Sequence, residues 1–163
     1  MNELFKRLID LLRLRAGPQD LPASWAITGL VMAIFMGQAL ITAQNLGGAT
    51  EAARSVLSVV VQFTAVAVLL RLRKHPERLQ QTLLALAGTG IALGLLAYVF
   101  LLQADPEVDQ PWLALVWFGI FGWSLAVDAN IFRHALGITM STGVLIAVLL
   151  LAFTFVVLEL AFR

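Results

Sequence analysis

The sequence predicts an all-α membrane protein: a polytopic helical bundle of five transmembrane helices, preceded by an amphipathic helix at the membrane surface. Apolar residues make up 60% of the 163-residue chain and charged residues 13%, with a mean hydropathy of +0.90. Soluble domains contain about 45–50% apolar and about 25% charged residues. The apolar residues form long runs, and Lys and Arg gather between alternate runs. This arrangement is typical of chains that cross a bilayer several times.

Residues 1–16 are predicted to form an amphipathic helix that lies in the headgroup layer of the membrane. Apolar side chains recur there at helical spacing, namely Leu4, Phe5, Leu8, Ile9, Leu11 and Leu12. We expect Lys6, Arg7, Arg13 and Arg15 to contact anionic lipid headgroups. Docking of this helix on a partner protein is the alternative. The segment does not have the pattern of a cleavable signal peptide.

Residues 17–163 are predicted to form the transmembrane bundle. The expected spans are about residues 25–46, 52–70, 82–103, 112–132 and 138–158. Each has about 19–22 residues, which at 1.5 Å per residue crosses a hydrocarbon core of about 30 Å. The low polar content excludes a β-barrel, so a helical bundle is the remaining class. Gly90 and Gly94, one turn apart on the third span, predict a close helix-packing surface.

The distribution of Lys and Arg predicts the orientation of the chain. Nine of the eleven cations fall in residues 1–16, residues 71–81 and the connection after residue 132, which would share one face of the membrane. The opposite face carries an acidic segment at 105–111. Since Lys and Arg are enriched in cytoplasmic loops, we expect a cytoplasmic N-terminus and a periplasmic C-terminus. The short loops and the lack of an organelle signal favour the bacterial inner (cytoplasmic) membrane.

Catalytic and cofactor motifs are not found in the sequence. Cysteine is absent, which excludes thiolate metal sites and cysteine nucleophiles. The two histidines, His75 and His134, are far apart at the predicted cytoplasmic rim, and neither belongs to a zinc motif or lies beside a serine nucleophile motif. We therefore expect a protein that is not an enzyme, with no cofactor, no metal site and no nucleic-acid partner.

Asp128 is the strongest candidate for a functional polar residue. It is predicted one turn from the cytoplasmic end of the fourth span. Because side chains lean toward the N-terminus of their helix, its carboxylate points toward the membrane centre. Burying a carboxylate in hydrocarbon costs several kcal/mol. Asp128 therefore needs a cation from Arg71, Arg73, Lys74, the N-terminal helix or a bound partner, or else it is protonated.

Three further polar side chains lie on a different face of the same helix: Asn130, Arg133 and His134. An ion pair between helices, or a carboxylate wetted at the rim, is the structural interpretation of Asp128. Binding of a proton, an ion or a partner is the functional one. Glu159 needs no special interpretation, since Arg163 follows it one turn later on the fifth span.

The layout of the chain resembles the Yip family of integral membrane proteins. The closest likeness is WSLAVDANIFRHALGITMSTGVLIAVLL, residues 123–150, which is similar to the penultimate span, short turn and final span of that family. The opening segment RAGPQDLPASW, residues 15–25, looks similar to prokaryotic members. Eukaryotic members bind small GTPases through a long cytoplasmic N-terminal region, whereas the segment before the first span is short here. For a prokaryotic member the resemblance implies a fold and no defined activity.

Three functions remain open on the sequence alone. The leading hypothesis is a non-enzymatic membrane scaffold or adaptor, such as a subunit of an envelope complex, that binds other membrane proteins or further copies of itself. The second is a small transporter or channel subunit that acts as an oligomer, with Gln38, Gln62 and Asp128 facing a shared path. The third, and least favoured, is a lipid-handling enzyme that uses residues at the rim.

Overall fold

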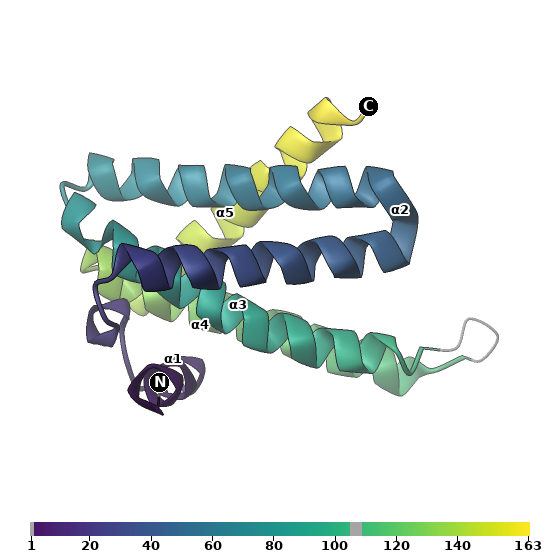
Figure 1. The fold of residues 1–163 in the computed structure, drawn as a ribbon, viewed down its shortest axis with the longest axis horizontal. Helices are drawn as coiled ribbons and strands as arrows, with labels where there is room; N and C mark the ends of the chain where they lie inside the picture. Colours follow the sequence, from purple (N-terminus) through teal and green to yellow (C-terminus); the bar gives the residue numbers. More distant parts are fainter. Residues whose placement is uncertain (1, 105–108) are drawn as a thin grey trace.

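The computed structural model describes residues 2–104 and 109–163, and these residues form helices without any strand (Figure 1). The α-helices are α1 (Asn2–Leu12), α2 (Trp25–Leu72), α3 (Leu79–Leu101), α4 (Pro111–Leu136) and α5 (Met140–Ala161). Two short 3-10 helices, η1 (Pro18–Asp20) and η2 (Pro76–Arg78), precede α2 and α3. The predicted all-α helical bundle is confirmed.

Helix α2 contains two of the predicted spans, joined by a sharp turn (Figure 1). Its arms, Trp25–Asn45 and Gly47–Leu72, are each long and apolar enough to cross a membrane. Gly48 lies between them with φ 70° and ψ −148°, a conformation that essentially only glycine adopts without strain. Residues 47–51, expected to connect the two spans as a loop, instead form this turn and the start of the second arm.

Within the described residues, five helical segments in all are long and apolar enough to be membrane spans. The fourth is longer than expected: α4 continues past residue 132 to Leu136 and ends at Gly137, which is left-handed with φ 64°. A left-handed glycine is a common end for a helix. The helix α4 therefore ends because of the backbone conformation of Gly137 and not because its last residues are polar. Arg133 and His134 therefore lie in the last turn of α4 and not in a connection.

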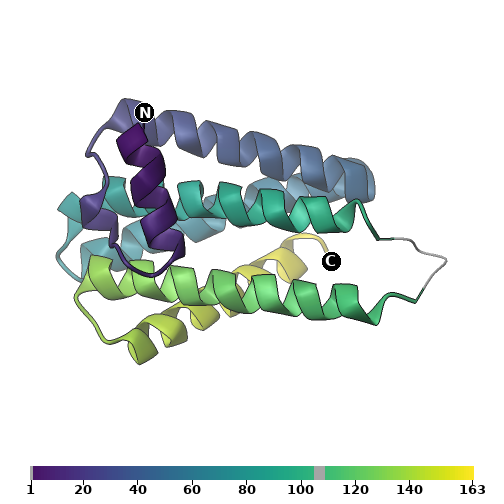
Figure 2. The same ribbon diagram turned by 90° about the horizontal axis from the view of Figure 1, so that it is seen from below.

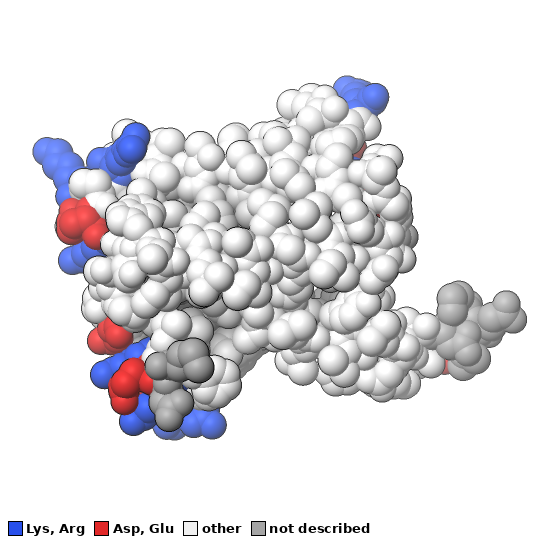
Figure 3. All heavy atoms as spheres, in the orientation of Figure 1, with Lys and Arg blue, Asp and Glu red and all other residues white. Residues whose placement is uncertain are grey.

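The charged residues mark the two ends of the bundle. Figure 3 shows most Lys and Arg side chains at one end, an uncharged belt along the middle, and few charges at the other end. We call the first the basic end; it contains α1, η1, η2 and the C-terminus of α4. We call the second the kink end, because it contains Gly48. The predicted acidic segment at 105–111 belongs to the connection between α3 and α4, and most of it lies outside the described residues.

Helix α1 crosses α3 and α4 at the basic end and is docked on them (Figure 2). Leu11 is fully buried. Leu8 lies so close to Gly88 of α3 that a Cβ atom there would be 2.6 Å from the Leu8 Cδ2 atom. The indole Nε1–H of Trp123 donates a hydrogen bond to the Leu12 carbonyl oxygen at 3.0 Å. The apolar face of α1 thus packs against α3 and α4.

Candidate functional site

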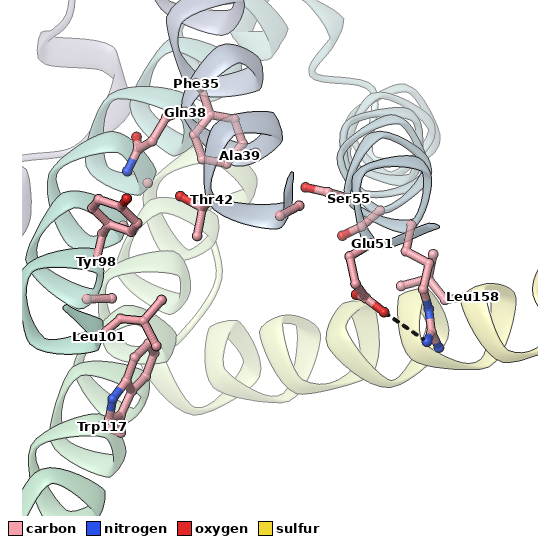
Figure 4. Close-up of a pocket in the computed structure, with 16 residues that line it drawn as sticks. Phe35, Gln38, Ala39, Thr42, Glu51, Ser55, Tyr98, Leu101, Trp117 and Leu158 are labelled. Atoms are coloured by element: carbon pink, nitrogen blue, oxygen red, sulfur yellow. Dashed lines mark ion pairs between the residues drawn. The ribbon is translucent and has the colours of Figure 1, made fainter. Parts of the chain in front are cut away.

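A cavity of three adjoining hollows lies among the spans. The first hollow, about 550 Å³, lies between the two arms of α2 and helices α3, α4 and α5 on the side of the kink end (Figure 4). Its polar lining consists of Gln38, Thr42, Glu51, Arg54, Ser55, Ser58 and Tyr98. In Figure 4, Gln38 and Thr42 extend from the first arm of α2, Ser55 and Glu51 from the second, and Tyr98 from α3.

The second and third hollows continue the cavity toward Asp128. The second hollow, about 330 Å³, shares Phe35, Gly90, Gly94, Ala97 and Trp117 with the first. The third hollow, about 110 Å³, shares Gln62, Phe121, Ser124 and Asp128 with the second. The three hollows therefore follow one another from the charged residues near the kink end to the Asp128 carboxyl group.

Asp128 is half-buried and has no ionic or hydrogen-bond partner among the described residues. It lies eight residues before the end of α4 at Leu136, which is about two helical turns and deeper than the single turn expected from the sequence. Its expected cationic partners do not reach it: Arg71 and Arg73, near the end of α2, are exposed. The carboxyl group borders the cavity and forms no salt bridge with the described residues.

Three hydroxyl groups of the inner lining donate their hydrogen atoms to their own helices. Ser124 Oγ donates to the Phe121 carbonyl oxygen at 2.8 Å, and Thr154 Oγ1 donates to the Leu150 carbonyl oxygen at 2.8 Å. Thr89 Oγ1, on the lining of the second hollow, donates to the Ala85 carbonyl oxygen at 2.8 Å. A hydroxyl has one hydrogen and two lone pairs. These side chains therefore have only acceptor lone pairs left over.

Gln38 contributes a further acceptor to the lining. Its Nε2 donates to the Ile91 carbonyl oxygen at 3.3 Å, while its Oε1 is buried without a hydrogen-bond partner in the part of the chain that the structure describes. A second amide, Gln62, lines the second and third hollows. Both glutamines proposed from the sequence as path residues thus border the interior of a single chain.

Charged groups near the kink end belong to one small network. The Arg54 guanidinium lies 3.1 Å from the Glu159 carboxylate and 3.5 Å from Glu51, the second of which is drawn in Figure 4. The expected partner of Glu159 was Arg163. Arg54 replaces it because the second arm of α2 and the end of α5 meet here, although the two residues are 105 positions apart in sequence.

Asn130, Arg133 and His134 lie at the basic end, on the far side of α4 from the cavity lining. Asn130 is buried, and its Nδ2 donates to the Ala16 carbonyl oxygen at 3.0 Å. His134 Nδ1 donates to the Asn130 carbonyl oxygen at 2.9 Å. Arg133 is exposed. None of the three lines the cavity beside Asp128, so the candidate set predicted on α4 divides between two places.

The other predicted residues lie where α1 and α3 place them. Lys6, Arg7, Arg13 and Arg15 are exposed at the basic end. Gly90 and Gly94 face the first arm of α2: a Cβ atom on Gly90 would be 2.7 Å from Phe35 Cε2, and one on Gly94 would be 2.6 Å from Gln38 Nε2.

Sequence reasoning missed the closest backbone approach and the polar contacts that hold the basic end together. A Cβ atom on Gly143 of α5 would overlap the Ala129 carbonyl oxygen of α4. Arg78 Nη1 donates to the His134 and Ala135 carbonyl oxygens at 3.0 Å each. A glycine one turn into an apolar span was the available signal for the first, whereas nothing in the local sequence indicates the second.

Comparisons with known proteins give no information on function, so a function has to be argued from the geometry of the structure. No protein-family model, no curated protein and no solved structure matches this chain. The resemblance of residues 15–25 and 123–150 to the Yip family therefore stays a prediction.

Proposed function

We propose that this chain is a small transporter subunit that takes a small ligand into the cavity between its membrane helices. The proposal depends on the Asp128 carboxyl group, which lies where the second and third hollows join. It has no ionic or hydrogen-bond partner among the described residues. Ionisable side chains inside a membrane bundle are expensive, and they generally mark substrate or ion pathways. Clefts of about 300–1,000 Å³ with a few polar groups are typical of ligand sites.

Two features support a cavity that works within one chain. Gln38, Gln62 and Asp128, which the sequence placed on a path shared between subunits, border successive hollows of the single bundle. The cavity also lies beside the Gly48 turn, where residues 47–50 are exposed. Exposed residues make few contacts, which leaves the turn itself free to move.

Access to the cavity is testable in this cysteine-free chain. Ser124→Cys places a thiol on the lining of the second and third hollows, and Val144→Cys places one on the exposed face of α5, where lipid would surround it. A small hydrophilic methanethiosulfonate needs a hydrated, ionisable thiol, so we expect it to label the thiol at position 124 at least about tenfold faster than the thiol at position 144. Equal, slow labelling at both positions would show that the cavity is closed and would refute the proposal.

A membrane adaptor is the second candidate, favoured by a surface groove. A hollow of about 590 Å³ lies between the second arm of α2 and α5, and nearly all of its lining is apolar, including Ala65, Val68 and Phe153. A transmembrane helix of a partner would fit such a groove by packing alone. Ala65→Trp would fill it, whereas Val144→Trp adds the same side chain elsewhere. An adaptor should lose a specific co-purifying protein only in the first variant.

The same proposal places the protein in a bacterial inner membrane, with the basic end on the cytoplasmic side. The support is the gathering of cations at one end (Figure 3), where Lys6, Arg7, Arg13 and Arg15 would contact anionic headgroups. Single cysteines at Glu77, at the basic end, and at Asp109, at the other, test the orientation. An impermeant thiol reagent added to intact cells should label position 109 and spare position 77; the reverse pattern would invert the topology.

A further inference from the structure

We propose that the cavity binds a lipophilic organic cation, with the Asp128 carboxylate as its counter-ion and the surrounding aromatic rings as its apolar contact. This inference rests on the proposed function, since it names the ligand class of the same cavity. It is carried by the charge of the lining, the direction of its hydrogen bonds and the kind of side chains around Asp128.

The charges along the cavity favour a cation. Arg54 is the one cationic residue among the described residues that line the three hollows, and it lies between two carboxylates, Glu51 and Glu159. This group of three carries a net charge of −1 near the kink end. Asp128 adds a second uncompensated carboxylate at the other end of the cavity. An anion would meet no free cation along this path.

The hydrogen bonds of the lining also favour a cation. Ser124, Thr154 and Thr89 have committed their hydroxyl hydrogens to backbone carbonyls, and Gln38 Oε1 is a buried acceptor without a partner among the described residues. Beside Asp128, these hydroxyl oxygens and the carboxylate are left as acceptors, and the Gln62 amide can accept as well as donate. A ligand with positive charge or N–H donors satisfies the acceptors, whereas a carboxylate or phosphate ligand would face the Asp128 carboxylate.

The aromatic side chains favour an organic cation over a metal ion. Phe35, Phe63, Trp117 and Phe121 line the second hollow together with Asp128, and the Phe35 and Phe63 rings pack with centroids 5.9 Å apart. Aromatic faces attract organic ammonium and related cations. Metal ions such as Mg²⁺ and Ca²⁺ need several oxygen ligands, and the described residues contain no cluster of three acidic, histidine or cysteine side chains.

Binding of tetraphenylphosphonium to the purified full chain in lipid nanodiscs tests the inference, with tetraphenylborate as a probe of matched shape and opposite charge. Empty nanodiscs measure partition into lipid. We expect saturable binding of the phosphonium and none of the borate. Asp128→Asn should weaken phosphonium binding by about thirtyfold or more, because one member of a buried charge pair is removed. Asp10→Asn makes the same change on α1, outside the cavity, and should leave binding unchanged.

A second variant and a competition complete the test. Phe121→Leu keeps the carboxylate and removes a ring from the second hollow, so it should weaken phosphonium binding by about threefold or more. It keeps the proposal falsifiable if the Asp128→Asn variant fails to fold. Equal binding by wild type, Asp128→Asn and Phe121→Leu would overturn the inference. So would displacement by sodium chloride but not by N-methylglucamine chloride, which would indicate an inorganic cation site.

The two proposals fail in different ways. If the thiol of Ser124→Cys is labelled but Asp128→Asn leaves phosphonium binding unchanged, the cavity is still accessible to a ligand. In that case only the proposed ligand class, an organic cation, is refuted. If that thiol is not labelled, the cavity is closed and the transporter proposal fails first. Protection of the thiol of Ser124→Cys by the phosphonium, with no protection by the borate, would support both proposals.

Discussion

The two halves of helix α3 lie in contrasting surroundings. Every residue from Thr82 to Thr89, toward the basic end, is buried, whereas none from Gly90 to Leu101, toward the kink end, is buried to the same degree. The first half is covered by α1, η1 and the neighbouring spans. The second half borders the first and second hollows. One helix therefore belongs to a tightly packed half of the molecule and to an open one.

This contrast indicates that the two ends of the bundle have different roles, one in stability and the other in ligand binding. At the basic end, buried side chains and hydrogen bonds to backbone carbonyls tie together segments that are distant in sequence, as Asn130 does with Ala16. Toward the kink end, the spans are less buried, and the first and largest of the three hollows lies there. Binding sites that must admit a ligand are generally drawn from the less stable part of a structure. Matched substitutions in the two halves measure whether that difference exists.

The largest effect is expected at Gly143, where α5 touches the backbone of α4. A Cβ atom there would overlap the Ala129 carbonyl oxygen, and backbone cannot move aside as a side-chain tip can. Gly143→Leu should lower the free energy of unfolding by about 3 kcal/mol or more. Gly119→Leu has open space around it and should change it by about 0.5 kcal/mol or less. Thermal unfolding in detergent, followed by tryptophan fluorescence, compares them.

Equal losses of stability in the two glycine variants would contradict the contrast. They would mean that α4 and α5 are as loosely packed at Gly143 as at the exposed Gly119, and that the basic end holds no special role in stability.

The next effect concerns buried amides. Asn130→Ala removes a hydrogen bond of 3.0 Å and leaves the Ala16 carbonyl oxygen buried without a donor, which should cost about 1–3 kcal/mol. Gln62→Ala, in the open half, breaks no hydrogen bond within the described residues and should cost less than about 1 kcal/mol. Limited proteolysis should also show faster cleavage near residue 16 in the Asn130→Ala variant alone. A larger loss at Gln62 would reverse the assignment of the two halves.

Much of this fold could be predicted from the sequence, because composition and hydrophobic run length decide it locally. The kink at Gly48 could not, since a glycine pair between two apolar runs is equally typical of a loop. The end of α4 was placed too early because Arg133 and His134 are polar. Both residues remain in the helix, where His134 donates a hydrogen bond to the Asn130 carbonyl oxygen. The helix ends only at Gly137.

The candidate site was predictable only in part. Asp128 stood out because a carboxylate in an apolar run has a cost whatever the fold. Its expected partners, Arg71 and Arg73, were chosen by their distance along the membrane normal, and the structure leaves them exposed. The cavity, and the pairing of Arg54 with Glu159, depend on how α2 and α5 cross. No local sequence pattern predicts how these two helices cross.

A smaller effect is expected for the two arginines that join distant segments. Arg78 donates from Nη1 to two carbonyls at the C-terminus of α4, and a lysine ammonium, which lies nearer the backbone than Nη1, would have to shift to reach both. Arg78→Lys should therefore lower the free energy of unfolding by about 1 kcal/mol. Arg54→Lys keeps a charge beside Glu51 and Glu159 on a partly exposed surface and should cost about 0.5 kcal/mol or less.

The arginine comparison is read from the same thermal unfolding measurements in detergent. A loss for Arg54→Lys that exceeds the loss for Arg78→Lys would show that the kink-end network holds the spans together, contrary to the contrast between the halves.

The smallest effect compares two glycines of α3 that face different neighbours, Gly88 against α1 and Gly94 against the first arm of α2. Gly88→Ala would place a Cβ atom 2.6 Å from Leu8 Cδ2, and Gly94→Ala would place one 2.6 Å from Gln38 Nε2. Alanine favours a helix by up to about 1 kcal/mol over glycine, so the sign depends on what the neighbour can do. Gln38 ends in a flexible amide beside the first hollow, with space to turn. Leu8 has both Cδ atoms against Gly88, so relief needs a new Leu8 side-chain conformation or a shift of α1.

We therefore expect Gly94→Ala to leave global stability unchanged or slightly raised, and Gly88→Ala to loosen α1. The measurement is protease cleavage within residues 2–15, which should accelerate by about threefold or more for Gly88→Ala, equivalent to less than about 1 kcal/mol. Gly94→Ala should not change it. Unchanged cleavage in both variants would mean that α1 is held by the membrane surface alone and that its contact with α3 adds nothing to the packing of the basic end.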